Sequence, residues 1–303
     1  MKVLFLGSSH FSVVVLNEML KKGVDVCGVI TQMDKPAGRG HKLTPTELKK
    51  FAIEKEINVF TFDKLRNHID DIKKIEYDIA VVASYGQILT DEFLSNKLTI
   101  NVHPSLLPKY RGATPMQSAI LNGDKESGVT IMKVAQEVDS GDIILQKKVS
   151  IENKYFKEIE AELGLLGGDL VFEALKQIEN NTVKFTPQCH KDAILVKKLS
   201  KSDGIINLNN SAEQIYNQVR ALSEEIGCYL QFENYNLKIG KIVDVSNEFS
   251  VEKGFVLNNK KRFIIGCEGG AIEILSCQAP SGKMISGRDY LNGHNEILGV
   301  KIN

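Results

Sequence analysis

The amino-acid sequence predicts an α/β fold in which a doubly wound, mostly parallel, Rossmann-like sheet is followed by a small OB-like β-barrel domain. Over residues 1–182, short apolar runs alternate with helical stretches, which is typical of parallel strands joined by crossover helices. Between residues 183 and 203 this periodicity fades. Over residues 204–303, one amphipathic helix precedes several short β-type runs. We therefore expect two domains joined by a linker.

The expected strands of the first domain are short runs rich in apolar and β-branched residues. They lie at residues 3–7, 24–31, 78–86, 98–103, 129–134 and 142–151. Helices are expected from about residue 12, near residues 45–55 and over residues 158–178. In the last of these helices, Leu163, Leu166 and Leu170 recur at spacings of three and four, which predicts a stripe that packs against the core.

The second domain should begin with an amphipathic helix over residues 211–222. The β-type runs that follow lie at residues 228–232, 235–245, 254–258 and 262–278. Turn signals such as Asn258-Asn259 and Gly269-Gly270 separate them. Short strands at this spacing are typical of a small barrel.

Composition excludes several classes of protein. The chain has 303 residues, of which 43% are hydrophobic and 25% charged, as in an ordinary globular protein. Its 38 basic residues balance 38 acidic ones, so net charge gives no sign of a nucleic-acid partner. The five cysteines form no Cys-x-x-Cys pair, which argues against a zinc site or a disulfide framework. No run approaches the roughly 20 apolar residues that span a bilayer, and we expect a cytoplasmic protein without a membrane partner.

Two polar residues end an apolar strand in the stretch NVHPSLLPKYRG. Because side chains alternate along a strand, Asn101 and His103 share one face. In a doubly wound sheet, ligands bind beyond the carboxyl ends of the strands, so an amide and an imidazole there resemble a prepared site. The alternative is a strand-end Asn that caps a turn beside a hydrogen-bonded His. These two residues alone do not decide between the two interpretations.

A carboxylate in a neighbouring loop favours the functional interpretation. The segment VDSGDI places Asp139 and Asp142 in a Gly-containing loop between two predicted strands, and we expect Asp142 to serve only the loop. If Asp139 reaches His103, it orients the imidazole and favours its charged form. Two donors aimed at one point would stabilise an oxyanion, by about 3 kcal/mol each. No Gly-x-Ser-x-Gly motif, which would mark a nucleophilic serine of the protein itself, accompanies them. The reaction class that remains is attack on a carbonyl by an external nucleophile.

The motifs NVHPSLLPKYRG and VDSGDI together resemble the signature of formyltransferases that use 10-formyltetrahydrofolate. This resemblance extends through VVASYGQIL, RGATPMQ and KKLSK to the barrel-like end, and so covers essentially the whole chain. It implies the formyltransferase fold and a catalytic trio at Asn101, His103 and Asp139. It also implies that 10-formyltetrahydrofolate is the co-substrate and that the reaction needs no metal. The sequence departs from the family in having no tryptophan.

The resemblance also implies binding residues. Candidates for contact with the folate lie in the turn after the third strand of the predicted sheet and in the loop after His103. They are Tyr85, Gly86, Ile88, Leu89, Ser105, Leu106, Leu107 and Pro108. Arg39 and Lys42, in the segment PAGRGHKL, match a basic loop that contacts tRNA in family members acting on initiator methionyl-tRNA. From the residues alone, this segment is an ordinary solvated basic loop.

The resemblance thus implies transfer of a formyl group to the α-amino group of methionyl-initiator-tRNA, and we expect the protein to be a monomer. The nearest alternative is an amino-sugar N-formyltransferase, which shares the strand-end motif but has no use for a basic loop directed at tRNA. A non-catalytic RNA- or folate-binding protein would not need Asn101, His103 and Asp139 together. A dinucleotide site is disfavoured because LGSSHF lacks the Gly-x-Gly-x-x-Gly pattern.

Overall fold

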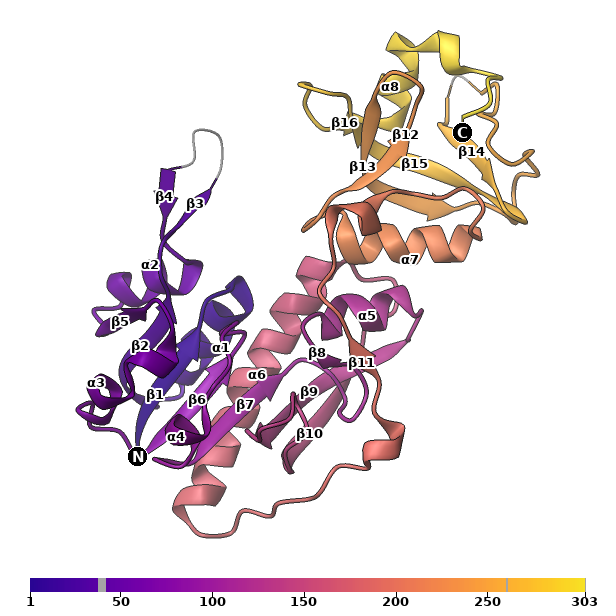
Figure 1. The fold of residues 1–303 in the computed structure, drawn as a ribbon. Helices are drawn as coiled ribbons and strands as arrows, with labels where there is room; N and C mark the ends of the chain where they lie inside the picture. Colours follow the sequence, from indigo (N-terminus) through magenta and orange to yellow (C-terminus); the bar gives the residue numbers. More distant parts are fainter. Residues whose placement is uncertain (38–41, 260, 303) are drawn as a thin grey trace. The chain divides into compact units, whose positions relative to one another are not determined.

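The computed structural model describes residues 1–37, 42–259 and 261–302 (Figure 1). The chain divides into two compact units. The first unit contains Met1–Pro115, Glu126–Ser150 and Ile159–Val196, and the second contains Met116–Lys125, Ile151–Glu158 and Lys197–Asn303. The domain boundaries expected from the sequence, at residues 182 and 203, stay a prediction.

A seven-stranded sheet in the order β10-β9-β7-β6-β1-β2-β5 forms the centre of the first unit. Its strands are β1 (Lys2–Gly7), β2 (Asp25–Gln32), β5 (Val59–Phe62), β6 (Ile79–Ala83), β7 (Thr99–His103), β9 (Glu126–Lys133) and β10 (Ile143–Ser150). The five strands from β5 to β7 are parallel, whereas β9 runs antiparallel to both β7 and β10. Since β2 lies on one side of β1 and β6 on the other, the strand order reverses at β1. That reversal is where doubly wound sheets bind ligands.

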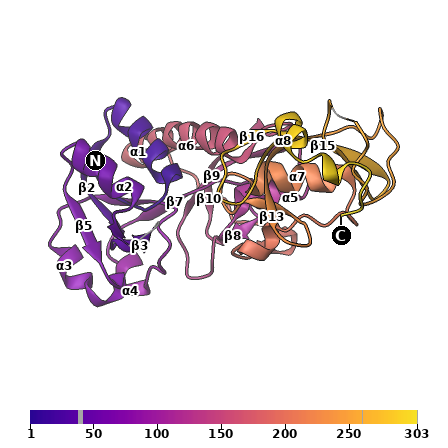
Figure 2. The same cartoon turned by 90° about the horizontal axis from the view of Figure 1, so that it is seen from above.

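Helices cover both faces of this sheet (Figure 2). The helical elements are α1 (His10–Lys21), α2 (Glu47–Glu54), η1 (Leu65–Asn67), α3 (Ile69–Lys73), α4 (Asp91–Leu94) and α6 (Phe156–Glu179). One core cluster joins Leu4, Ile30 and Val82 of the sheet to residues of η1, α3 and α4. On the opposite face α6 packs closely on α1 and β7. At Gly167 of α6 the approach is so close that an added Cβ would lie 2.8 Å from Val102 of β7.

The segment that follows α6 stays in the first unit up to Val196. Thr186 forms an isolated antiparallel bridge with Ile143 at the start of β10. Then η2 (His190–Asp192) leads into β11 (Leu195–Val196), which pairs in parallel with β8 (Arg111–Gly112). The residues just before the second unit therefore lie against the loop that follows β7.

An antiparallel sheet forms the centre of the second unit. Its strands are β12 (Cys228–Gln231), β13 (Asn236–Asp244), β14 (Ile264–Cys267), β15 (Gly270–Gln278) and β16 (Ile285–Ser286). The helical elements are α5 (Pro115–Leu121), which starts in the first unit, η3 (Lys201–Gly204), α7 (Ala212–Leu222), α8 (Gly287–Gly293) and η4 (Asn295–Ile297). The fold class is confirmed: a mostly parallel α/β sheet precedes an antiparallel β unit that agrees with a small barrel-like domain. Within the described ranges, no helix is long and apolar enough to cross a membrane.

Candidate functional site

Strand β7 places Asn101 and His103 on one face of the sheet at its carboxyl end, as alternation predicts. Both residues pair with β9, where Asn101 lies opposite Met132 and His103 opposite Thr130. The hydroxyl of Thr130 donates to the carbonyl of Ser105 at 2.7 Å and accepts from the backbone N–H of Leu107 at 3.2 Å. The loop after His103 is therefore fixed to β9.

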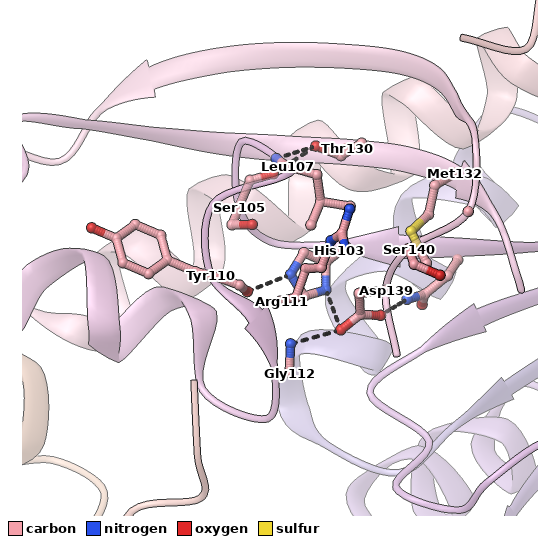
Figure 3. A network of polar contacts seen from close by, with 12 residues as sticks. His103, Ser105, Leu107, Tyr110, Arg111, Gly112, Thr130, Met132, Asp139 and Ser140 are labelled. Carbon is pink, nitrogen blue, oxygen red and sulfur yellow. Dashed lines mark hydrogen bonds and ion pairs between the residues drawn. The ribbon is translucent and has the colours of Figure 1, made fainter. Parts of the chain in front are cut away.

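Asp139 connects the strand end to the loops around it (Figure 3). Its Oδ1 accepts a hydrogen bond from Asn101 Nδ2 at 3.2 Å, and its Oδ2 accepts one from the backbone N–H of Gly112 at 2.9 Å. His103 Nδ1 lies 3.5 Å from the same Oδ2. The structure thus brings together the three residues that the sequence analysis selects, and it adds Gly112.

The proton on His103 can be located from its partners. Nε2 lies 2.9 Å from the carbonyl oxygen of Tyr110. A carbonyl oxygen only accepts, so Nε2 carries a hydrogen. Nδ1 then accepts in the neutral ring or donates towards Asp139 in the charged ring.

The two donors expected to converge on a ligand are directed differently in the structure. Both ring nitrogens of His103 face protein oxygens, and the side chain is only 4% exposed, against 14% for Asp139. An amide group has two N–H hydrogens, so the bond to Asp139 engages one of the two that Asn101 carries. The exposed chemistry of this cluster is therefore a carboxylate beside an amide donor, with the imidazole behind the carboxylate.

Gly112 brings its N–H to Asp139 through a conformation that suits glycine. Its φ is +116°, and a Cβ there would lie 2.4 Å from the carbonyl oxygen of Val196 in β11. The pairing of β8 with β11 leaves no room for a side chain at this position. Gly112 is part of NVHPSLLPKYRG, but nothing in that pattern tells which backbone N–H reaches the carboxylate.

Arg111 and Gln188 form a buried pair next to this cluster, with 4% and 6% exposure. Arg111 donates from Nε at 3.0 Å and from Nη2 at 2.7 Å to Oε1 of Gln188. In turn, Gln188 Nε2 donates to the backbone carbonyls of Asp139 at 2.9 Å and of Gly141 at 2.7 Å. Sequence reasoning missed Gln188, because TPQC lies where periodicity fades and a single Gln in a polar segment gives no signal.

The turn after β6 carries four of the predicted folate contacts. Tyr85 is buried, which raises the pKa of its hydroxyl to about 12, and its backbone carbonyl accepts from Gln32 Nε2 at 2.7 Å. Leu89 packs against the core of the sheet. Ile88 is 88% exposed, and together with Gly86 it lines a cavity of about 350 Å³. The remaining lining residues are Gln32, Met33, Lys35, Asp63, Lys64, Leu65, Arg66 and Gln87.

The loop after His103 carries the other four predicted contacts, and the structure gives two of them internal roles. Ser105 is fully buried and donates to the carbonyl of Lys109 at 2.6 Å. Leu107 is 3% exposed, whereas Leu106 and Pro108 are partly exposed. Contact between these residues and a folate stays a prediction.

The basic segment after β2 forms a short hairpin of β3 (Lys35–Ala37) and β4 (Lys42–Thr44). Lys42 is exposed at the start of β4. Arg39 lies outside the described residues. For the described part of the chain, no group of three His, Cys, Asp or Glu side chains is placed to hold a metal ion.

Comparison with known families supports one assignment along almost the whole chain. A family model described as "Formyl transferase" matches residues 1–163, and one described as "Formyl transferase, C-terminal domain" matches residues 198–295. The methionyl-tRNA formyltransferase of Lactobacillus gasseri is 39% identical over 96% of this chain and 95% of that protein. The methionyl-tRNA formyltransferase of a Sulfurihydrogenibium species is 36% identical over 99% of both chains.

Solved structures share the fold at lower identity. WlaRD, a sugar 3N-formyl transferase, superposes with a TM-score of 0.69 at 24% identity, over 93% of this chain and 99% of that one. HypX from Aquifex aeolicus, in complex with tetrahydrofolic acid, gives a TM-score of 0.69 at 17% identity. The match covers 100% of this chain but only 48% of HypX. At these identities the likeness establishes the fold alone.

Proposed function

The chain belongs to the formyl transferase family, and from this premise we propose that it transfers a formyl group to the α-amino group of methionyl-initiator-tRNA. The formyl donor in this proposal is 10-formyltetrahydrofolate. One observation carries the proposal: in a chain similar to methionyl-tRNA formyltransferases over almost its full length, Asn101, His103 and Gly112 converge on the carboxylate of Asp139.

The chemistry of the reaction matches the groups of this cluster. The amine nitrogen attacks the formyl carbon, a new C–N bond forms, and the bond from that carbon to N10 of the folate breaks. During attack the formyl oxygen gains negative charge, and a donor such as the Asn101 amide stabilises it. The attacking nitrogen must lose a proton, the Asp139 carboxylate is the acceptor in this scheme, and N10 takes up a proton as it leaves, so that tetrahydrofolate is released and the carboxylate is restored.

His103 acts on Asp139 in this proposal. Its ring is held by the carbonyl of Tyr110 on one side and lies 3.5 Å from Asp139 Oδ2 on the other. When the carboxylate takes up the proton, Nδ1 of the neighbouring neutral ring can accept a hydrogen bond from it.

The folate is proposed to lie along the turn after β6, with Asp139 at its reactive end. Supporting this placement, Gly86 and Ile88 line a cavity at the carboxyl edge of the sheet, where doubly wound folds bind ligands. Tyr85, Leu89 and the loop of residues 105–108 complete the proposed site. The tRNA is proposed to contact Lys42 and Arg39. A cytoplasmic location and a monomeric state stay predictions.

One assay tests the proposed function directly. The protein is incubated with 10-formyltetrahydrofolate carrying a labelled formyl group, and with either initiator methionyl-tRNA or a nucleotide-linked amino sugar. We expect label on the methionine of the tRNA, and release of formylmethionine when the ester is hydrolysed. Label on the amino sugar alone would show that the acceptor is wrong, and label on neither would contradict the activity itself.

A further inference from the structure

The structure assigns Gln188 a role as a positioning residue for the catalytic carboxylate: it holds the loop that carries Asp139, and Arg111 holds Gln188. This inference rests on the proposed function, since it assumes that Asp139 takes part in formyl transfer. All three residues belong to the first unit. Gln188 comes from the segment after α6, far along the chain from the strand-end motif.

The backbone of Asp139 needs external support. Its φ is +49°, a left-handed conformation that costs free energy in any residue with a Cβ, although Asp tolerates it better than most. Such a conformation persists only where the surroundings over-determine it, and it is found preferentially at functional sites. In this loop the backbone bonds that surround it include a long one, from Ser140 N–H to the carbonyl of Glu137 at 3.4 Å.

Gln188 supplies the missing support with a single side chain. Its Nε2 carries two hydrogens, and the short bonds go to the carbonyls of Asp139 and Gly141 at 2.9 and 2.7 Å, with a longer contact to Met132 Sδ at 3.9 Å. These two carbonyls lie before and after Ser140 in the chain. One amide group therefore fixes the backbone at both Asp139 and Gly141. Arg111 and Gln188 are both buried, and these hydrogen bonds are therefore shielded from solvent.

Arg111 determines which way the Gln188 amide faces. The guanidinium has no acceptor, and two of its N–H groups point at Oε1 of Gln188. Turning the amide over would place its NH2 against the guanidinium and its oxygen against two carbonyls. Only the observed orientation satisfies both the two Arg111 N–H groups and the two backbone carbonyls, so Nε2 is directed at the Asp139 loop.

The same short strand, β8, fixes both the backbone and the side chain of Asp139. Arg111 anchors the loop through Gln188, and Gly112 donates its N–H to the Asp139 carboxylate at 2.9 Å. If Gln188 stops donating, the loop can shift against β8 and move the carboxylate away from Asn101 and His103. A displacement of about 1 Å at a reacting group can reduce the rate on the order of a hundredfold.

The alternative is a purely structural role, in which Gln188 stabilises the fold without positioning Asp139. The substitution Gln188→Glu separates the two roles, because it keeps an oxygen for Arg111 but replaces the donor with an oxygen that repels both carbonyls. A matched control is Gln177→Glu, near the end of α6, where the amide donates a long, exposed bond to Glu173 at 3.4 Å. Arg111→Lys is a second variant, which keeps the charge but loses the forked donation.

The experiment measures kcat and KM for formylation of methionyl-tRNA in the wild type and in these variants, with the folded fraction determined by circular dichroism. The same Gln188→Glu change is also made in an Asp139→Asn background. We expect Gln188→Glu to lower kcat by about tenfold or more with KM for both substrates within about threefold. In the Asp139→Asn background the further loss should be under about threefold, because there is no carboxylate left to position. Arg111→Lys should lower kcat in the same direction, and Gln177→Glu should stay within about twofold of the wild type.

Two results would overturn the inference while leaving the proposed function intact. One is an active wild type in which Gln188→Glu or, if that variant does not fold, Arg111→Lys keeps kcat within about twofold. The other is an equal loss in the wild-type and Asp139→Asn backgrounds, which indicates a general effect on the fold. A folded wild type that does not formylate methionyl-tRNA overturns the proposed function and this inference with it.

Discussion

His103 donates a hydrogen bond from Nε2 to the carbonyl oxygen of Tyr110 at 2.9 Å, and this contact turns Nδ1 towards Asp139. The ring is therefore fixed at both nitrogens, and it approaches the reaction only through the carboxylate. Tyr110 itself has a φ of +61°, so the carbonyl that holds the ring belongs to a backbone conformation as unusual as that of Asp139. The His103 ring and the Asp139 carboxylate are thus both held by loop residues with left-handed backbone conformations, Tyr110 and Asp139 itself.

Replacing His103 with Ala should lower kcat on the order of a hundredfold, because the Asp139 carboxylate loses the ring that lies 3.5 Å from its Oδ2 and holds it in place. The folded fraction, measured by far-UV circular dichroism, should stay near that of the wild type. The control is His294→Ala, a partly exposed histidine paired with Glu296. Full single-turnover activity in the His103 variant would show that the imidazole plays no part.

Replacing Gly112 with Ala should reduce the free energy of unfolding by about 2–4 kcal/mol. A Cβ there would lie 2.4 Å from the carbonyl oxygen of Val196, and the φ of +116° disfavours a side chain. Urea unfolding followed by circular dichroism measures the change. Gly293→Ala is the control, since among the described residues a Cβ there would meet no atom within 4 Å other than those of its chain neighbours and its own helix, and its effect should stay below about 0.5 kcal/mol. Equal stability of the two variants would contradict the packing of β11 on β8.

Glu160 should make stability depend on pH. Burial raises the pKa of its carboxyl above the ordinary 4.5, and His10 Nδ1 at 3.1 Å offsets this only in part. The folded state holds the Glu160 proton more tightly than the unfolded state does. The resulting contribution of Glu160 to the free energy of unfolding is therefore complete below the unfolded-state pKa and is lost as the pH rises through the folded-state pKa.

The free energy of unfolding of the wild type should therefore fall, relative to that of Glu160→Gln, as the pH rises above about 4.5. Urea unfolding of both proteins at several pH values measures this difference. A difference that is constant, or that increases with pH, would contradict the raised pKa.

Replacing Lys42 with Ala should raise KM for methionyl-tRNA several-fold and leave kcat unchanged. If the exposed Lys42 side chain contacts a phosphate, the slope of log affinity against log salt concentration should decrease by about 0.7–0.9. Lys55→Ala, at the end of α2, is the control because its charge lies on a different element. Unchanged affinity and slope would show that this hairpin does not contact the tRNA.

The fold class could be predicted from the sequence because its signal is local. Apolar runs and helical periodicity alternate over the first unit, and alternation along β7 places Asn101 and His103 on one face. The position of Asp139 in a loop after a strand of the same sheet is also visible in the sequence. Its contact with the strand end is not, since it depends on the path of a left-handed turn.

The supporting groups could not be predicted for two physical reasons. Gly112 acts through its backbone N–H, which every residue other than proline has, so the sequence does not show that this particular N–H reaches the carboxylate. Gln188 acts across a long sequence separation, from a segment expected to be a linker. What fixes its role is the match of one amide to two carbonyls and one guanidinium, and that match exists only in the folded chain.

The central claim is that the Asp139 carboxylate, held by Asn101, Gly112 and His103, takes part in formyl transfer. The most direct test is the single-turnover rate of Asp139→Asn with 10-formyltetrahydrofolate and initiator methionyl-tRNA, because the amide matches the shape of the carboxylate but accepts no proton. We predict a rate on the order of a hundredfold or more below that of the wild type, with affinity for the tRNA unchanged. A rate within about twofold of the wild type would contradict the account.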